Sequence, residues 1–235
     1  MANSSPRATL GDHVHLLARA GISSIPVIGG PALELFNYLL APPIQRRRDE
    51  WLNELEERLS KFEQEGRVNL EALRDNEEFI STVMQASAIA IRNHEQEKIE
   101  ALRNAVVNTA VGQSPENSKR ELFLNFVDSF TVPHLRVLKA LFQGDQVVPR
   151  NVPVKTAITE ITELAVRLVP AMGAQPELAE VIVEDVCRKG LLFWNRRPGT
   201  AIYVQSDATQ VSPLGREFLR FLSEPSDLTE SADDR

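Results

Sequence analysis

Apolar residues recur at helical spacing along most of this chain. The clearest stripe is formed by Trp51, Leu52, Leu55, Leu59 and Phe62. Its main spacings of four, four and three residues match one face of an α-helix, since 3.6 residues make a turn. The prolines at 42 and 43 precede this stripe, and Gly66 follows it. The pattern therefore predicts a long helix that starts after the two prolines and ends near Gly66.

Three more amphipathic stretches follow before residue 131. They cover about 79–93, 99–112 and 122–130, with short polar segments between them. Helices that each have one apolar face must bury those faces against one another. We therefore predict a helical bundle over residues 9–130, preceded by a disordered N-terminus at 1–8.

The segment 22–44 is strongly apolar, with Glu34 as its only charged residue and Arg46, Arg47 and Arg48 just after it. Its six Pro and Gly residues argue against a membrane-spanning helix, because they would leave backbone groups unpaired in lipid. Two interpretations stay open: a helical hairpin packed in the bundle core, which we favour, or a peripheral anchor on an anionic membrane. The candidate membrane or partner contacts are Ile25, Val27, Ile28, Leu33, Phe36, Leu40, Arg46, Arg47 and Arg48. In the core interpretation Leu33, Phe36 and Leu40 pack against the stripe of the long helix.

The pattern changes after Thr131. Helices are predicted over 133–142, 154–168 and 176–189, followed by a β-hairpin over 191–205 and a closing helix over 213–222. Three helices, a hairpin and a helix is the order of a winged-helix domain, which we assign to residues 131–222. The remaining segment, 223–235, has five acidic residues and one basic residue and is predicted to be a disordered tail. The predicted fold class is mainly α, with a helical bundle followed by a winged-helix-like domain.

Composition narrows the possible compartments and partners. The chain has a net charge of −7, so it is not suited to coat nucleic acid. Its single cysteine, Cys187, permits no intramolecular disulfide, which fits a reducing compartment. Arg19 interrupts the early sequence, so no signal peptide is predicted. We expect a cytoplasmic protein, located peripherally at the inner membrane face if the lipid interpretation holds.

Candidate chemistry is sparse. His13 and His15 are two residues apart, which points them to different faces of a helix and makes a poor metal pair. His94 and Glu95 begin like a zinc-protease motif, but Lys98 stands where the second histidine ligand would be. No phosphate-binding loop, dinucleotide fingerprint or nucleophile elbow is present in the sequence. We predict a protein that is not an enzyme and that needs no metal or cofactor.

The predicted third helix of the winged-helix domain decides between DNA and protein as its partner. This helix carries Glu177, Glu180, Glu184 and Asp185 against only Arg188 and Lys189. Four carboxylates beside phosphates would oppose DNA binding, so a protein contact is favoured. The candidate contact residues of this domain are Arg188, Lys189, Arg196 and Arg197. The two basic neighbours of Cys187 could lower its pKa, but a buried structural thiol is the favoured interpretation.

Two motifs resemble a known family. In the first, Glu97, Lys98, Leu102, Arg103, Asn104 and Asn108 match the pattern E-K-x-x-x-L-R-N-A-h-x-N, where h is apolar. The second motif is h-x-x-L-T-x-x-H-h-x-h-L. Its matching residues are Thr131, His134, Leu135 and Leu138, while Phe130 stands where the pattern has Leu before Thr. With these motifs, residues 76–222 are similar in layout to bacterial helical proteins of the abortive-infection alpha type. The resemblance implies a bacterial protein of phage defence or stress, and it brings no catalytic residue.

The prediction is thus a non-enzymatic bacterial adaptor or effector that acts through helix faces and the winged helix, with a potentially membrane-active N-terminal segment. A protein partner is expected, with self-association and an anionic membrane surface as further partners. The alternative is a winged-helix transcriptional regulator that binds DNA.

Overall fold

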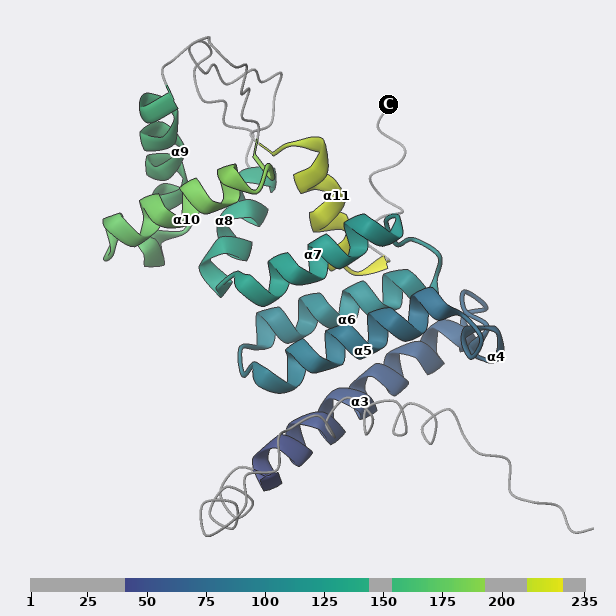
Figure 1. The fold of residues 1–235 in the computed structure, drawn as a ribbon. Helices are drawn as coiled ribbons and strands as arrows, with labels where there is room; N and C mark the ends of the chain where they lie inside the picture. Colours follow the sequence, from purple (N-terminus) through teal and green to yellow (C-terminus); the bar gives the residue numbers. More distant parts are fainter. Residues whose placement is uncertain (1–40, 144–153, 193–210, 226–235) are drawn as a thin grey trace, which may run out of the picture. The chain divides into compact units, whose positions relative to one another are not determined.

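The computed structural model describes residues 41–143, 154–192 and 211–225 and is mainly α, as predicted (Figure 1). Its helices are α3 (Ala41–Gln64), α4 (Leu70–Leu73), α5 (Glu77–Arg92), α6 (Gln96–Ala110), α7 (Asn117–Ser129), α8 (Val132–Gln143), α9 (Val154–Leu168), the 3₁₀ turn η1 (Pro170–Met172), α10 (Pro176–Arg188) and α11 (Pro213–Leu222). Two compact units divide the chain. Unit 1 comprises Met1–Asp128 with Leu222–Arg235, and unit 2 comprises Ser129–Phe221.

Helix α3 is the long helix that the apolar stripe predicts. It starts at Ala41, so the predicted start after Pro42 and Pro43 is wrong. Both prolines fall in the first turn, where backbone N–H groups have no partner within the helix and proline is tolerated. The helix ends at Gln64, and Gly66 then takes a left-handed φ of 70°, which glycine adopts without steric cost. Four of the five stripe residues are buried: Trp51, Leu52, Leu55 and Leu59. Phe62 is half-buried, and the guanidinium of Arg67 lies 4.4 Å from its ring centroid.

Helices α5 and α6 lie side by side and α3 packs on both of them (Figure 1). The side chain of Asn76 caps α5 by accepting a hydrogen bond from the backbone N–H of Phe79 at 3.0 Å. Helix α7 joins the surface of α5 through polar contacts, including the ion pair of Arg92 with Asp128 at 3.1 Å. Buried α6 is the central helix of unit 1, because only a third of its residues keep appreciable exposure.

Unit 2 is built on three helices, α8, α9 and α10, each of which packs on the other two. The buried face of α10 consists of Ala179, Ile182, Val183, Val186 and Cys187. This face follows the 3.6-residue period, so α10 is a helix with one inner and one outer face. Gly190 ends it with a left-handed φ of 75°.

The start of α11 is fixed by a side-chain cap. The Ser212 hydroxyl accepts a hydrogen bond from the backbone N–H of Gly215 at 2.9 Å and donates one to the carbonyl of Gly190 at 2.6 Å. Gly215 has no room for a side chain, since a Cβ there would lie 2.1 Å from the carbonyl oxygen of Leu191. This close approach requires glycine at position 215.

The predicted β-hairpin over 191–205 is not supported. Residues 193–210 lie outside the described part of the chain, and residues 41–143, 154–192 and 211–225 contain no strand. Leu192 forms an antiparallel bridge with Val211, which lies beyond the predicted second strand. The alternation of apolar and polar residues therefore located one end of a β contact but assigned its partner wrongly.

The predicted disordered tail differs from the structure at its first residues. Ser223, Glu224 and Pro225 are described, they belong to unit 1, and Pro225 is buried. An acidic composition predicts a solvated segment, and it does not reveal that backbone carbonyl groups in the segment make specific contacts.

Among the described helices, none combines the length and the apolar character that crossing a bilayer requires.

Candidate functional site

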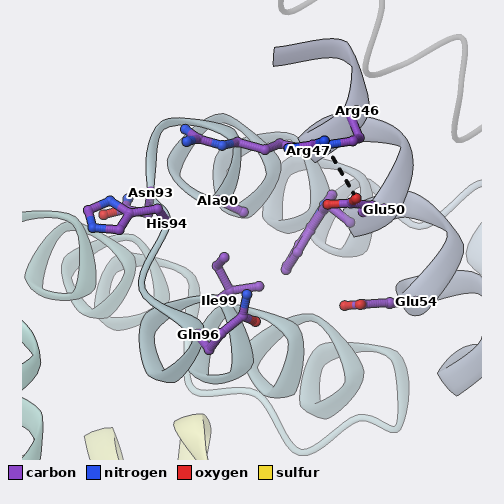
Figure 2. A pocket seen from close by; sticks show the side chains of 10 residues that line it. Arg46, Arg47, Glu50, Glu54, Ala90, Asn93, His94, Gln96 and Ile99 are labelled. Carbon is purple, nitrogen blue, oxygen red and sulfur yellow. Dashed lines mark ion pairs between the residues drawn. The ribbon is translucent and has the colours of Figure 1, made fainter. Parts of the chain in front are cut away.

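A shallow depression lies between the N-terminal half of α3 and the turn that joins α5 to α6. Its volume is about 150 Å³, and Trp51 forms part of its wall. Figure 2 shows Ile99 pointing into it from α6, opposite Arg46 and Arg47 of α3, with His94 at the turn. Pockets for small molecules usually measure about 300–1,000 Å³, so this depression suits a single side chain of a partner better than a cofactor.

The charges around the depression are mixed. Arg46 forms an ion pair with Glu50 at 3.6 Å, with side chains that are 75% and 62% exposed (Figure 2). An exposed pair of this kind contributes about 0–1 kcal/mol, so Arg46 can change partners at small cost. Across the residues that the structure describes, no group of three His, Cys, Asp or Glu side chains is placed to hold a metal ion.

The predicted run of three arginines separates into different environments. Arg48 is only 21% exposed and pairs with the adjacent Asp49 at 2.9 Å, while Arg46 is paired with Glu50 and Arg47 lines the depression. The apolar members of the same predicted surface lie outside the described residues; they are Ile25, Val27, Ile28, Leu33, Phe36 and Leu40. Both interpretations of these residues, packing in the core and contact with a membrane or partner, stay predictions.

A second constellation, which the sequence did not reveal as a site, lies between α3 and α6. This α3–α6 polar cluster consists of Glu54, Arg58, Glu100, Arg103, Asn104 and Asn108. The side chain of Arg103 is only 8% exposed; its guanidinium donates to the carboxylates of Glu54 and Glu100. It also lies 5.8 Å from the ring centroid of Trp51. Arg58 donates to Glu100 and, at 2.7 Å, to the side-chain oxygen of Asn104.

The two asparagines of the cluster hold Leu222, the last residue of α11, and the residue after it. The Asn104 amide donates to the carbonyl of Leu222 at 2.9 Å, and the Asn108 amide donates to the carbonyl of Ser223 at 2.8 Å. The last carbonyls of a helix have no donor within the helix, so side-chain amides satisfy them here. Arg58 adds an ion pair with Glu224 at 3.5 Å.

Lys98 is a buried cation near the end of α7. Its ammonium donates to the carbonyl of Asp128 at 3.1 Å, and the residue as a whole is only 4% exposed. Burial lowers the pKa of Lys98, while the negative charges of Asp128 and Glu95 act in the opposite direction. A cation at the C-terminal end of a helix interacts favourably with its exposed carbonyl groups. The role that this geometry supports is a cap on α7.

Thr131 and His134 form a local capping arrangement at the start of α8. Nδ1 of His134 accepts the backbone N–H of Thr131 at 3.2 Å and lies 2.8 Å from the threonine hydroxyl. Nε2 lies 3.5 Å from the carboxylate of Asp185. This order of hydroxyl, imidazole and carboxylate suggests a catalytic triad, but the backbone N–H already occupies the lone pair of Nδ1. The arrangement therefore explains the Thr-x-x-His spacing by helix capping.

Two of the predicted winged-helix contacts, Arg188 and Lys189, lie at the C-terminal end of α10. Arg188 pairs with Glu184 at 2.6 Å, and Lys189 lies 3.9 Å from Asp185 on the same helix. Arg196 and Arg197 lie outside the described residues. The outer face of α10, opposite its buried residues, exposes two apolar side chains, Leu178 at 47% and Val181 at 59%.

Cys187 lies on the opposite, inner face of α10 and is buried, as the favoured interpretation held. Burial raises the pKa of its thiol to about 12, and the neighbouring carboxylate of Glu184 adds to this effect. The basic neighbours therefore do not activate the thiol.

No protein-family model, curated protein or solved structure matches this chain. The resemblance to abortive-infection alpha proteins thus stays a prediction from the two motifs. Six of their polar residues make capping contacts or belong to the α3–α6 polar cluster, namely Lys98, Arg103, Asn104, Asn108, Thr131 and His134. A signal for the cluster was present in the sequence, because Asn104 and Asn108 are polar residues one helical turn apart within an otherwise apolar stretch.

Proposed function

We propose that this chain is a non-enzymatic protein-interaction protein, an adaptor or effector, that binds its partner through the outer face of α10. We define this face by Glu177, Leu178, Glu180, Val181 and Glu184. The observation that carries the proposal is the exposure of Leu178 and Val181 on a helix whose inner face is already fully packed. These two side chains are not needed to hold α10 in place.

The energetics favour burial of this face against another protein. Fully covering a Val or Leu side chain contributes about 1.5–3 kcal/mol, so covering two half-exposed ones contributes about half as much for each. Apolar residues surrounded by charged ones are the usual composition of a contact that forms and dissociates. The three glutamates around them would give the contact its orientation and selectivity.

A protein partner is favoured over DNA by the state of the basic residues. Arg188 and Lys189 each have a carboxylate of α10 beside them, so contact with phosphate would compete with an existing ion pair. Glu177 and Glu180 are exposed, and their negative charges would repel the phosphates of DNA. DNA binding stays the alternative function.

The winged-helix architecture of unit 2 is part of the proposal. It is supported by the mutual packing of α8, α9 and α10 and by the bridge of Leu192 with Val211, which brings the chain back to the end of α10. The resemblance of residues 76–222 supports a role in bacterial phage defence or stress. A cytoplasmic protein with a potentially membrane-active segment at 22–44 is the setting we propose.

The test is co-purification from the native host with wild-type chain and two variants. Leu178→Glu combined with Val181→Glu should fold normally and lose its partner, because it places two more charges on the outer face of α10. Leu122→Glu is the matched control, since Leu122 is also an exposed leucine, at 39%, but lies on α7. If both variants keep the same partner, the proposal is wrong. Salt-dependent binding of the chain to DNA with clear sequence preference would establish the alternative.

A further inference from the structure

The segment Leu222–Pro225 is held by polar groups of the α3–α6 polar cluster. We propose that this cluster is a binding site for the end of a helix that continues into an acidic segment, and that the chain's own residues 222–225 occupy it in cis. The proposal concerns a different surface from the outer face of α10 and does not depend on it.

Recognition in this site is directed mainly at backbone. Asn104 and Asn108 are separated by one helical turn, so their side chains extend from the same face of α6. Their amide groups donate to two consecutive carbonyls, those of Leu222 and Ser223, at 2.9 and 2.8 Å. Leu222 is the last residue of α11 and Ser223 follows it in a bend, so these donors select the main chain of a helix end whatever its side chains are.

Arg58 adds selectivity for a carboxylate. It donates to the side-chain oxygen of Asn104 at 2.7 Å, which fixes that amide with its nitrogen toward the segment. The same guanidinium lies 3.5 Å from the carboxylate of Glu224 and also pairs with Glu100. The following residue, Pro225, is buried. The ligand that fits is therefore a segment with two free carbonyls, then a carboxylate and a proline.

An occupied site is favoured over an empty one, and the segment bound in cis can be replaced by another segment. Buried amides that lose their acceptors are unfavourable, so an empty site would favour any segment that supplies two carbonyls. The contact of Glu224 is long and this side chain is 51% exposed, so the bound segment is anchored only weakly at that end. In addition, the Nε–H of Arg103, a side chain that is only 8% exposed, has no hydrogen-bond acceptor among the described residues. A competing ligand that reached this N–H would gain a contact.

The test uses the full chain carrying Glu224→Arg, which places a second cation beside Arg58 and weakens the segment in cis. The probe is a capped peptide with the sequence Phe-Leu-Ser-Glu-Pro-Ser, and the readout is the shift of the Asn104 and Asn108 side-chain amide signals in NMR spectra. We expect the peptide to bind this variant at least about ten-fold more tightly than the wild-type chain. A peptide with lysine in place of glutamate should bind the variant about ten-fold more weakly than the original peptide.

The control adds Asn104→Ala and Asn108→Ala to Glu224→Arg, and it should abolish peptide binding. Circular dichroism melting confirms that each variant is folded, and Glu224→Gln replaces Glu224→Arg if the latter unfolds. Absence of peptide binding to the folded variant would overturn the proposal and leave the contact as internal packing. Equal binding to variant and wild type, or binding that survives loss of both asparagines, would also overturn it.

Discussion

Helices α6 and α10 have similar lengths, 15 and 13 residues, yet they differ in how many residues they bury and in the polarity of those residues. Helix α6 buries ten residues, and five of these are polar or charged: Lys98, Arg103, Asn104, Asn108 and Thr109. Helix α10 buries five, none of them charged, and leaves one whole face exposed. The difference teaches that a surrounded helix can be rich in polar residues when each of their side chains makes at least one hydrogen bond, whereas a helix with a purely apolar inner face keeps its outer face available.

The thiol of Cys187, on the inner face of α10, should react slowly with thiol reagents in the folded protein. Because burial raises the pKa of Cys187 from 9.0 to about 12, the thiolate fraction at pH 8 should be about a thousand-fold below that of an ordinary thiol. Reaction with a thiol reagent should be correspondingly slow in the folded protein and fast in urea. Cys187 is the only cysteine, so the signal is unambiguous.

The same shift has a consequence for stability. The folded state keeps the Cys187 proton above pH 9, whereas the unfolded state loses it, so the free energy of unfolding should fall as pH rises from about 9 toward 12. Rapid labelling of Cys187 in the folded protein at pH 8, at the rate seen in urea, would contradict the burial of this thiol on the inner face of α10.

Replacing Ile182 with Ala should cost about 2–5 kcal/mol of unfolding free energy, because the side chain is only 1% exposed and its loss leaves a cavity. Urea denaturation followed by circular dichroism measures the change. Val181→Ala, one residue away on the outer face, is the matched control. A cost below 1 kcal/mol for Ile182→Ala would mean that α10 is not packed by this face.

Replacing Asn108 with Ala should cost about 1–3 kcal/mol, since the carbonyl of Ser223 would lose a buried donor. Asn125→Ala is the control, because Asn125 makes an exposed contact with Gln85 at 3.3 Å and its loss should cost less than about 0.5 kcal/mol. Equal costs for both changes would remove the distinction between buried polar groups of α6 and surface polar groups.

The smallest effect is expected for Val181→Ser. This side chain is 59% exposed, so the free energy of unfolding should change by less than about 0.5 kcal/mol. Chemical denaturation of the variant beside wild type measures this. A loss above 1 kcal/mol would show that Val181 stabilises the chain itself, and the comparison of α6 with α10 would fail.

Hydrophobic spacing was sufficient to predict the amphipathic helices. The stripe from Trp51 to Leu59 and the inner face of α10 both appear as buried faces, because one apolar side repeats at the helical period. The short helix α4 was not predicted, since Leu70–Leu73 is a single turn and depends on the cap supplied by Asn69.

The site was harder to predict than the helices. Periodicity cannot identify partners of polar groups that lie far apart in sequence, such as Asn104 and Leu222, so the α3–α6 polar cluster was missed. The β partner of Leu192 was wrong for a similar reason, because strand pairing is set by tertiary contacts as much as by local preference. What the sequence did indicate was the acidic character of α10 and its preference for protein over DNA, which stays a prediction.

Site-specific photo-crosslinking tests the central claim most directly, namely that the outer face of α10 contacts a protein. A photoreactive amino acid is placed at position 181 in the full chain and, as a control, at position 122 on α7, and both are irradiated in the native host. We predict one discrete protein adduct from position 181 that is absent from position 122 and disappears when Leu178→Glu is added. No adduct from position 181, or an adduct with DNA, would contradict the account.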